Sequence, residues 1–145
     1  MKKRTPATLF LLLLCSIFAM GCEDSEIVIM KAKSKASEVG HAAGTYVKLQ
    51  EAYFSETEKI GTGEEIGYIA PESKIFQYDA SQKGILTAIL LEDLGVSNKC
   101  PKGSIWTIKT SIKDKYSIQI NAEISGPNPK ACEALTPNFK KLQSL

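Results

Sequence analysis

The stretch KAKSKASEVGHAAGTYVKLQEAYFSET, residues 31–57, decides the fold of this chain. Its apolar residues recur at steps of three and four, which is typical of a helix with one buried face. The apolar stripe comprises Ala32, Ala36, Val39, Ala43, Tyr46, Val47, Tyr53 and Phe54. Because the stripe begins with alanines and ends with aromatics, its second half should bury most of the area. The sequence therefore predicts one long helix whose C-terminal half packs on a sheet formed by the following residues.

Beyond Gly63 the apolar residues alternate with a period of two, which predicts β-strands. We expect the strands at residues 66–70, 75–78, 84–91, 104–112 and 116–124. A turn at residues 113–115 joins the last two into an antiparallel hairpin. Residues 84–91 are apolar on both alternating faces, so both faces are predicted to be buried. The side chains expected to face the helix are Ile85, Ile89, Trp106, Ile108, Ile118 and Ile120.

These elements predict an α+β domain, in which a long N-terminal helix packs on an antiparallel sheet of about four strands. One sheet face meets the helix stripe, and the other is exposed to solvent. Residues 126–129, Gly-Pro-Asn-Pro, close the sheet, and the tail after them is expected to loop back over it.

The first residues, MKKRTPATLFLLLLCSIFAMGC, have the pattern of a bacterial export signal. Three basic residues precede an apolar run that is too short for a comfortable membrane span and ends in small residues. The Gly21-Cys22 step resembles the lipobox of bacterial lipoproteins, so we expect cleavage before Cys22 and lipidation of that cysteine. Cys15 is a poorer candidate because a bulky residue, Leu14, precedes it. An ordinary secretory signal with an incidental cysteine is the alternative.

We divide the chain into three parts on this basis. Residues 1–21 form the signal peptide, residues 22–30 a lipid-anchored tether and helix lead-in, and residues 31–145 the α+β domain. The domain is of a size that suits a single small core.

The charge balance argues against nucleic acid as a partner. The chain has 18 basic and 16 acidic residues, but removing Lys2, Lys3 and Arg4 with the signal leaves one more acid than bases. The remaining chain contains lysine but no arginine, which also disfavours bidentate phosphate recognition. The basic character of the whole chain therefore belongs to the signal.

Cysteine usage agrees with export. Cys15 leaves with the signal and Cys22 carries lipid, which leaves Cys100 and Cys132. In an oxidising compartment these two should form a disulfide. Without the export context they would be read as buried thiols.

The order of these parts resembles a type IV pilin or pseudopilin head. Residues 36–71, ASEVGHAAGTYVKLQEAYFSETEKIGTGEEIGYIAP, are similar to the helix-to-loop stretch in a subgroup of pilin-like bacterial proteins. The paired Cys100 and Cys132, with CEALTPNF near the end, add to the resemblance, which covers roughly residues 32–142. It implies a helix, a loop, an antiparallel sheet and a C-terminal disulfide that encloses the last strands.

The chain departs from that family at its start. Prepilins retain about twenty apolar residues after the cleavage site, and these pack in the filament core. Here the apolar run precedes Cys22 and would be removed, and only Ile27–Met30 follow as an apolar run. We therefore expect a pilin-type head on a lipid anchor that does not polymerise by itself.

No catalytic or metal constellation stands out, and no cofactor is predicted. His41, the single histidine, is expected on the helix surface, and Gly61-Thr62-Gly63 is expected to be a turn. Trp106 is a candidate binding platform, but core packing is favoured because it shares a face with isoleucines. The carboxylates weighed for metal or acid–base chemistry, and assigned to solvated surface instead, are Glu23, Asp24, Glu26, Glu64, Glu65, Glu92 and Asp93.

The sequence favours a non-enzymatic envelope protein, lipid-anchored at the periplasmic face or the cell surface. Its role would be structural or adhesive, or accessory to a pilus-like or type II secretion system, with proteins of that system as partners. The alternative is a periplasmic or surface binding or inhibitor module that uses a strand edge or the loop at residues 92–103. An enzyme ranks third.

Overall fold

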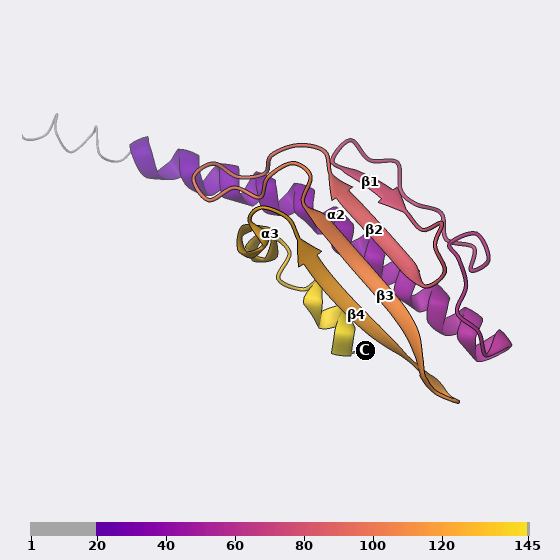
Figure 1. Ribbon diagram of the computed structural model, residues 1–145. Helices are drawn as coiled ribbons and strands as arrows, with labels where there is room; N and C mark the ends of the chain where they lie inside the picture. The colour runs from indigo at the N-terminus through magenta and orange to yellow at the C-terminus, as the bar shows by residue number, and fades with distance from the viewer. Residues whose placement is uncertain (1–19, 145) are drawn as a thin grey trace, which may run out of the picture.

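The computed structural model of the 145-residue chain describes residues 20–144, and the side-chain surroundings of residues 26–143. In this part a long helix packs on a four-stranded antiparallel sheet of order β1-β2-β3-β4 (Figure 1), which confirms the predicted α+β class. The elements are α2 (Met20–Thr57), β1 (Phe76–Asp79), β2 (Ile85–Leu90), β3 (Ile105–Asp114), β4 (Ser117–Ser125), α3 (Pro129–Leu135) and the 3-10 helix η1 (Lys140–Ser144).

Helix α2 buries the predicted stripe. Every member of the stripe is buried except Tyr53, which is half-buried, and Ala42 and Gln50 are buried beside them. The helix ends at Thr57, as predicted, but the residue that leaves it in the left-handed conformation is Glu58, at φ 57°, and not a glycine. The Glu58 amide still donates to the Phe54 carbonyl at 2.8 Å, which closes the last turn.

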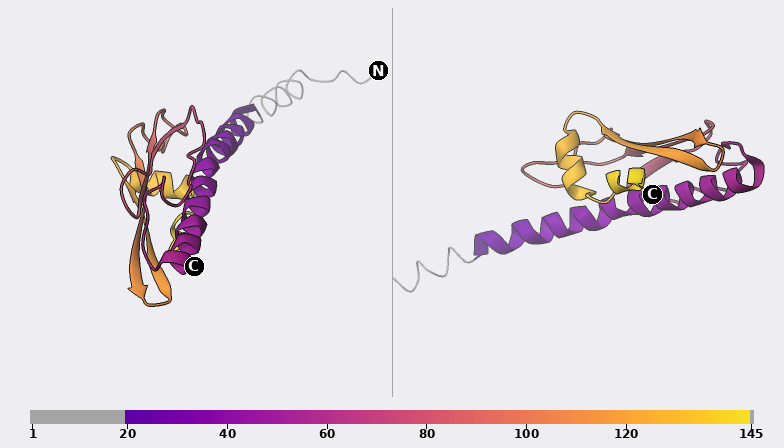
Figure 2. Two further views of the ribbon diagram at one scale, coloured as in Figure 1. Left: turned by 90° about the vertical axis from the view of Figure 1, so that its right-hand side faces the viewer. Right: turned by 90° about the horizontal axis from the view of Figure 1, so that it is seen from below.

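The N-terminal part of α2 extends beyond the sheet (Figures 1 and 2). Residues 22–30, predicted as a tether and helix lead-in, belong to this helix. Met30 is 69% exposed there, and Ile27 and Ile29 are also exposed, whereas burial begins at Ala32. No helix within residues 20–144 is long and apolar enough to cross a membrane.

The face of strand β2 that packs toward the helix is the opposite of the predicted one. Leu86, Ala88 and Leu90 are buried, while Ile85 and Ile89 are only half-buried on the other side. Register with β3 sets this choice, because Leu86 lies opposite Ile108 and Ala88 lies opposite Trp106, both of which are buried. The prediction of Ile85 and Ile89 as core residues was therefore wrong.

The strand predicted at residues 66–70 is absent, because residues 63–67 fold into a turn. The Thr62 amide donates to the Glu65 carboxylate at 2.7 Å, and the Glu65 amide donates to the Thr62 hydroxyl at 3.2 Å. This reciprocal pair is the arrangement of a capping box. Gly67 then adopts φ 70°, which reverses the chain.

The β3–β4 hairpin is longer than the rest of the sheet. Its turn lies at Lys115 and Tyr116, and a bulge at Lys113 separates the Ile112–Ile118 pair from the Asp114–Ser117 pair. Tyr116 is therefore a turn residue, and not the first strand residue. Ile120 is buried as predicted, whereas Ile118 is half-buried and Ile112 is exposed.

The C-terminal segment returns to the helix side of the sheet, as the sequence predicts (Figure 2). Asn128 caps α3 by accepting from the Ala131 amide, and η1 packs on β4. Trp106 is 1% exposed, stacks edge-on against Phe76, and donates from Nε1 to the Thr136 hydroxyl at 3.0 Å. The single tryptophan therefore joins the sheet to the tail and is not a surface platform.

Candidate functional site

The predicted lipidation site lies at the edge of the described chain. The signal peptide, residues 1–21, lies outside the described residues except for its last two positions, which belong to α2. Cys22 is in the first turn of α2, and its side chain lies outside the described side chains. The lipobox-like step at Gly21-Cys22 thus stays a prediction.

The predicted disulfide between Cys100 and Cys132 is present. Both cysteines are fully buried, and 32 residues separate them. Cys100 also forms a two-way backbone bridge with Leu94, so the loop at residues 92–103 is closed upon itself. The disulfide attaches α3 to this loop and encloses β3 and β4, which is the arrangement expected from the sequence.

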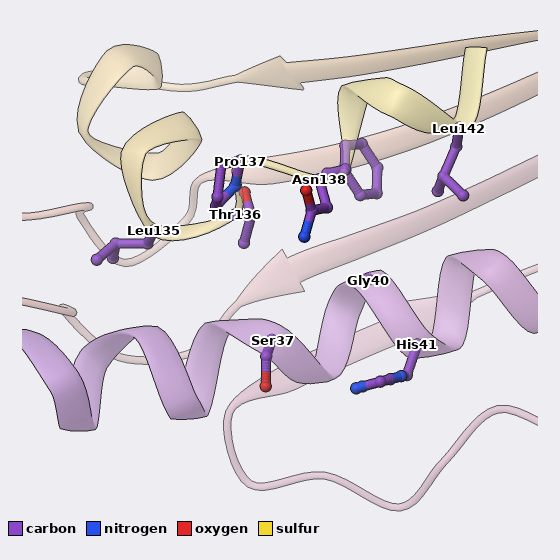
Figure 3. Close-up of a pocket in the computed structure, with 9 residues that line it drawn as sticks. Ser37, Gly40, His41, Leu135, Thr136, Pro137, Asn138 and Leu142 are labelled. Atoms are coloured by element: carbon purple, nitrogen blue, oxygen red, sulfur yellow. The ribbon is translucent and has the colours of Figure 1, made fainter. Parts of the chain in front are cut away.

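A groove of about 310 Å³ runs between α2 and the segment from Leu135 to Leu142 (Figure 3). The lining includes Ser37 and His41 of the helix and Asn138 of the tail. Figure 3 shows the His41 ring turned away from the segment that carries Asn138. His41 is exposed, and it also borders a second groove of about 270 Å³ on the other side of α2. Ser37 and His41 both line the first groove, but the Ser37 hydroxyl donates to the Ser34 carbonyl at 2.7 Å, and within the described part no hydrogen bond joins it to His41. The grooves therefore suit contact better than catalysis.

Both acids of the Glu92-Asp93 pair form ion pairs with lysines. Glu92 pairs with Lys35 at 2.6 Å, and Asp93 pairs with Lys99 at 2.6 Å. Asp93 also accepts from the Lys102 amide at 2.8 Å, which is the main cause that lowers the pKa of this carboxyl. Among the described residues, no group of three or more His, Cys, Asp or Glu side chains could hold a metal ion. Glu92 and Asp93 therefore fasten the loop at residues 92–103.

Two tyrosine hydroxyl groups, those of Tyr68 and Tyr78, have raised pKa values. Tyr78 donates to the Glu38 carboxylate at 2.9 Å, and burial together with this bond raises the pKa of Tyr78 far above its usual value. Burial raises the pKa of Tyr68 to about 12, and the Tyr68 hydroxyl has no hydrogen-bond partner within the described part. These phenols remain protonated at neutral pH, so they contribute packing and hydrogen bonds.

A buried amide clamp, which the pattern reading did not single out, holds the loop after α2. Gln50 is 0% exposed, and its Nε2 donates to the Gly61 carbonyl at 2.7 Å and to the Tyr46 hydroxyl at 2.9 Å. The Gly61 amide donates back to the Gln50 Oε1 at 3.1 Å. Gln50 lies three and four residues from members of the apolar stripe, and this spacing is the signal that identifies it. Gly61 is thus held in place as part of a turn.

The end of the β3–β4 hairpin presents the most exposed aromatic side chain of the described part. Tyr116 is 85% exposed and Ile112 is 53% exposed. The Lys115 ammonium lies 5.5 Å from the centre of the Tyr116 ring. An exposed tyrosine is typical of contact surfaces, in which aromatic side chains are enriched.

Comparisons with protein-family models, with curated proteins and with solved structures give no match to this chain. The site is therefore described from its own geometry. That geometry comprises a protruding helix end, a disulfide-closed loop, two shallow grooves beside α2 and an exposed hairpin end.

Proposed function

We propose that this chain is a non-enzymatic, lipid-anchored protein of the bacterial cell envelope with a pilin-like head. Its role is structural or adhesive, or accessory to a pilus-like or type II secretion system. The observation that carries the proposal is the continuity of α2 from Met20 to Thr57. The lipidated position and the core of the head then belong to one helix.

The geometry of α2 supports an anchor at Cys22. Among the described side chains the first buried one, Ala32, lies ten positions after Cys22, which corresponds to about 15 Å along a helix. A lipid on Cys22 would thus hold the head clear of the headgroups by a rigid spacer. Exposed Ile27, Ile29 and Met30 lie on this spacer, next to the bilayer surface.

The occupied carboxylates support a non-enzymatic role. Asp93 and Glu65 each accept a short hydrogen bond or ion pair within their own loop, and Glu92 pairs with Lys35 of α2. A general acid or base needs a side chain that is free to exchange a proton with a substrate. These groups instead stabilise the loops that surround the sheet.

Membrane fractionation with acyl labelling tests the anchor. The wild-type chain and the Cys15→Ala control should enter the membrane fraction and take up labelled palmitate. Cys22→Ala should lose the label and leave the membrane fraction. Retention of the label by Cys22→Ala, or a wild-type protein free in the periplasm or medium, would contradict the proposal.

Co-purification separates the accessory role from the alternative of a free-standing binding or inhibitor module. Cross-linking in the native membrane, followed by purification, should recover pilus or secretion-system proteins with the lipidated chain. Recovery of a single unrelated target by the lipidated chain would favour the binding module. The hairpin end is the feature that favours this alternative, because it exposes Ile112 and Tyr116.

A further inference from the structure

The β3–β4 hairpin continues past the part of the sheet that the helix and the tail cover. On its core-facing side β3 is buried as far as Thr110, and Ile112 beyond it is exposed. Ile118, which lies opposite Ile112, is half-buried, and Tyr116 is fully in solvent at the turn. We call the following group the tip surface: Ile112, Lys113, Lys115, Tyr116 and Ile118.

The tip surface has a positive charge that the turn does not neutralise. The Asp114 carboxylate accepts from the Tyr116 amide at 2.8 Å and from the Ser117 hydroxyl at 2.6 Å. The bond from Ser117, with smaller contributions from the Tyr116 amide and from the charge of Lys113, lowers the pKa of Asp114, so this carboxylate stays charged and offsets one of the two lysines. Lys113 and Lys115 form none of the ion pairs found among the described residues. Residues 113–115 therefore carry a net charge of +1, and the Lys115 ammonium lies beside an exposed phenol, which suits an acidic partner.

The hairpin also has a free backbone edge at its tip. The Thr110 amide donates to the Gly84 carbonyl, so even-numbered residues of β3 bond to β2 and odd-numbered ones bond to β4. In β4 the even-numbered residues then turn their peptide groups away from the sheet. Gln143 of η1 covers this edge at one point, where its Nε2 donates to the Ala122 carbonyl at 2.6 Å. Nearer the tip, the outward peptide groups of the described chain belong to Ile118 and Ile120.

The tip lies at the far end of the molecule from the proposed anchor. Figures 1 and 2 show the hairpin turn near the C-terminal end of α2, opposite the end at which α2 begins. A partner in the envelope could reach the tip without displacing the head from the membrane.

We infer that the tip surface binds an extended, acidic segment of a partner protein, which adds as a strand to the free edge of β4. The partner backbone bonds to the peptide groups of Ile118 and Ile120, and its carboxylates meet Lys113 and Lys115. Tyr116 supplies the exposed aromatic contact. The inference deepens the proposed function, since it names the surface through which the anchored head meets its partner.

Charge disfavours a second copy of this chain as the occupant. Two tips docked on each other would bring four ammonium groups and only two Asp114 carboxylates to one small surface, and like charges in cross-strand contact are destabilising. An acidic segment meets the same surface with favourable Coulomb energy. Such binding should weaken as the ionic strength rises.

Fluorescence anisotropy with the lipidated full chain in detergent micelles tests the inference. The probe is a labelled synthetic peptide of alternating glutamate and valine. Its comparisons are a lysine–valine peptide and a glutamate–proline peptide, which lacks the amide donors needed for strand addition. The tip variants are Lys113→Glu/Lys115→Glu and Tyr116→Ser. The charge-matched control is Lys33→Glu/Lys74→Glu, at two exposed lysines away from the tip.

The glutamate–valine peptide should bind the wild type and the control variant equally. Each tip variant should weaken binding by about tenfold or more, as expected for central contact residues. The lysine–valine and glutamate–proline peptides should bind at least about tenfold more weakly than the probe. Circular dichroism and thermal unfolding confirm that the variants are folded.

Three results would overturn the inference. The first is no binding of the probe, or binding that the tip variants leave unchanged. The second is equal binding of the glutamate–proline peptide, or displacement of the probe by the anionic polysaccharide alginate at the tip, which would indicate charge alone. The third is self-association of the wild type that Tyr116→Ser abolishes, measured by analytical ultracentrifugation. Each leaves the lipidation of Cys22 untouched, so failure of the tip and failure of the anchor are distinguishable.

Discussion

Replacing Gln50 by leucine should be one of the most damaging single changes in the helix, although leucine is the better helix former. The Gln50 side chain is fully buried and exchanges two hydrogen bonds with the backbone of Gly61. Leucine has a similar volume but neither donates nor accepts. In Gln50→Leu the buried Gly61 amide and the Tyr46 hydroxyl would therefore lose this partner, whereas the Gly61 carbonyl would keep the Gly84 amide as a donor at 2.9 Å.

The magnitude follows from the two orphaned groups. A buried polar group without a partner costs about 1 to 3 kcal/mol, and the added apolar burial of leucine offsets part of the sum. We expect Gln50→Leu to lower the free energy of unfolding by about 2 to 5 kcal/mol. In urea the unfolding midpoint should fall by about 1 to 2 M, with little change in slope.

Two variants sharpen this test. Glu51→Leu makes an apolar substitution at the next position, which is exposed, and should change stability by less than about 0.5 kcal/mol. Gln50→Glu keeps an acceptor for the Gly61 amide but buries a carboxyl, whose pKa should rise. Its stability should therefore recover as the pH falls, because a raised native pKa stabilises the fold below the unfolded value. If Gln50→Leu unfolds at the same urea concentration as the wild type, the clamp does not stabilise the fold.

Three further predictions concern other parts of the head. Replacing both Cys100 and Cys132 by serine should lower the free energy of unfolding by about 2 to 5 kcal/mol, because the disulfide closes a loop across a sequence separation of 32. Identical urea unfolding of the oxidised and reduced protein would show that the disulfide does not stabilise the fold. The Tyr68 phenol has a pKa of about 12 against 10.0 in the unfolded chain, so its contribution to stability is complete below pH 10 and is lost as the pH rises through 12. Ultraviolet titration should show this phenol ionising near pH 12, and ionisation near pH 10 would contradict its burial. Gly84→Ala should lower the melting temperature more than Gly67→Ala. Both glycines have φ near 70°, but only at position 84 would an added Cβ lie as close as 2.7 Å to other atoms. Equal decreases in melting temperature would mean that the close contact relaxes.

The phase of the helix and its end at Thr57 could be predicted from the sequence, whereas its start at Met20 could not. Apolar residues that repeat with a period of 3.6 all lie on a single helix face. Turning any other face toward the sheet would expose the aromatic side chains. Gln50 lies on the same face, but a stripe of apolar residues does not by itself include a polar member. Only the approach of Gly61 in the folded chain explains why an amide is buried there.

The strands could be placed from the sequence, but the inward face of β2 could not. In residues 85–90 both alternating sets of side chains are largely apolar. The pattern therefore predicts a strand, but it does not predict which set of side chains is buried. The pairing of Leu86 with Ile108 then selects the buried set. The strand expected at residues 66–70 failed for a related reason, because the reciprocal bonds of Thr62 and Glu65 hold the preceding segment in a turn.

The sequence by itself determined the fold class, the helix face, the hairpin, the disulfide pair and the burial of Trp106. Each of these features follows from a local repeat of apolar residues or from the number of cysteines. None of them requires the positions of residues far apart in the chain to be known. Only the tertiary structure decided which face of β2 is buried, which acids are occupied, and that Ile112 and Tyr116 stand in solvent. Those outcomes depend on where the helix and the tail stop covering the sheet. That limit is set by the packing of segments far apart in the chain and not by any local pattern.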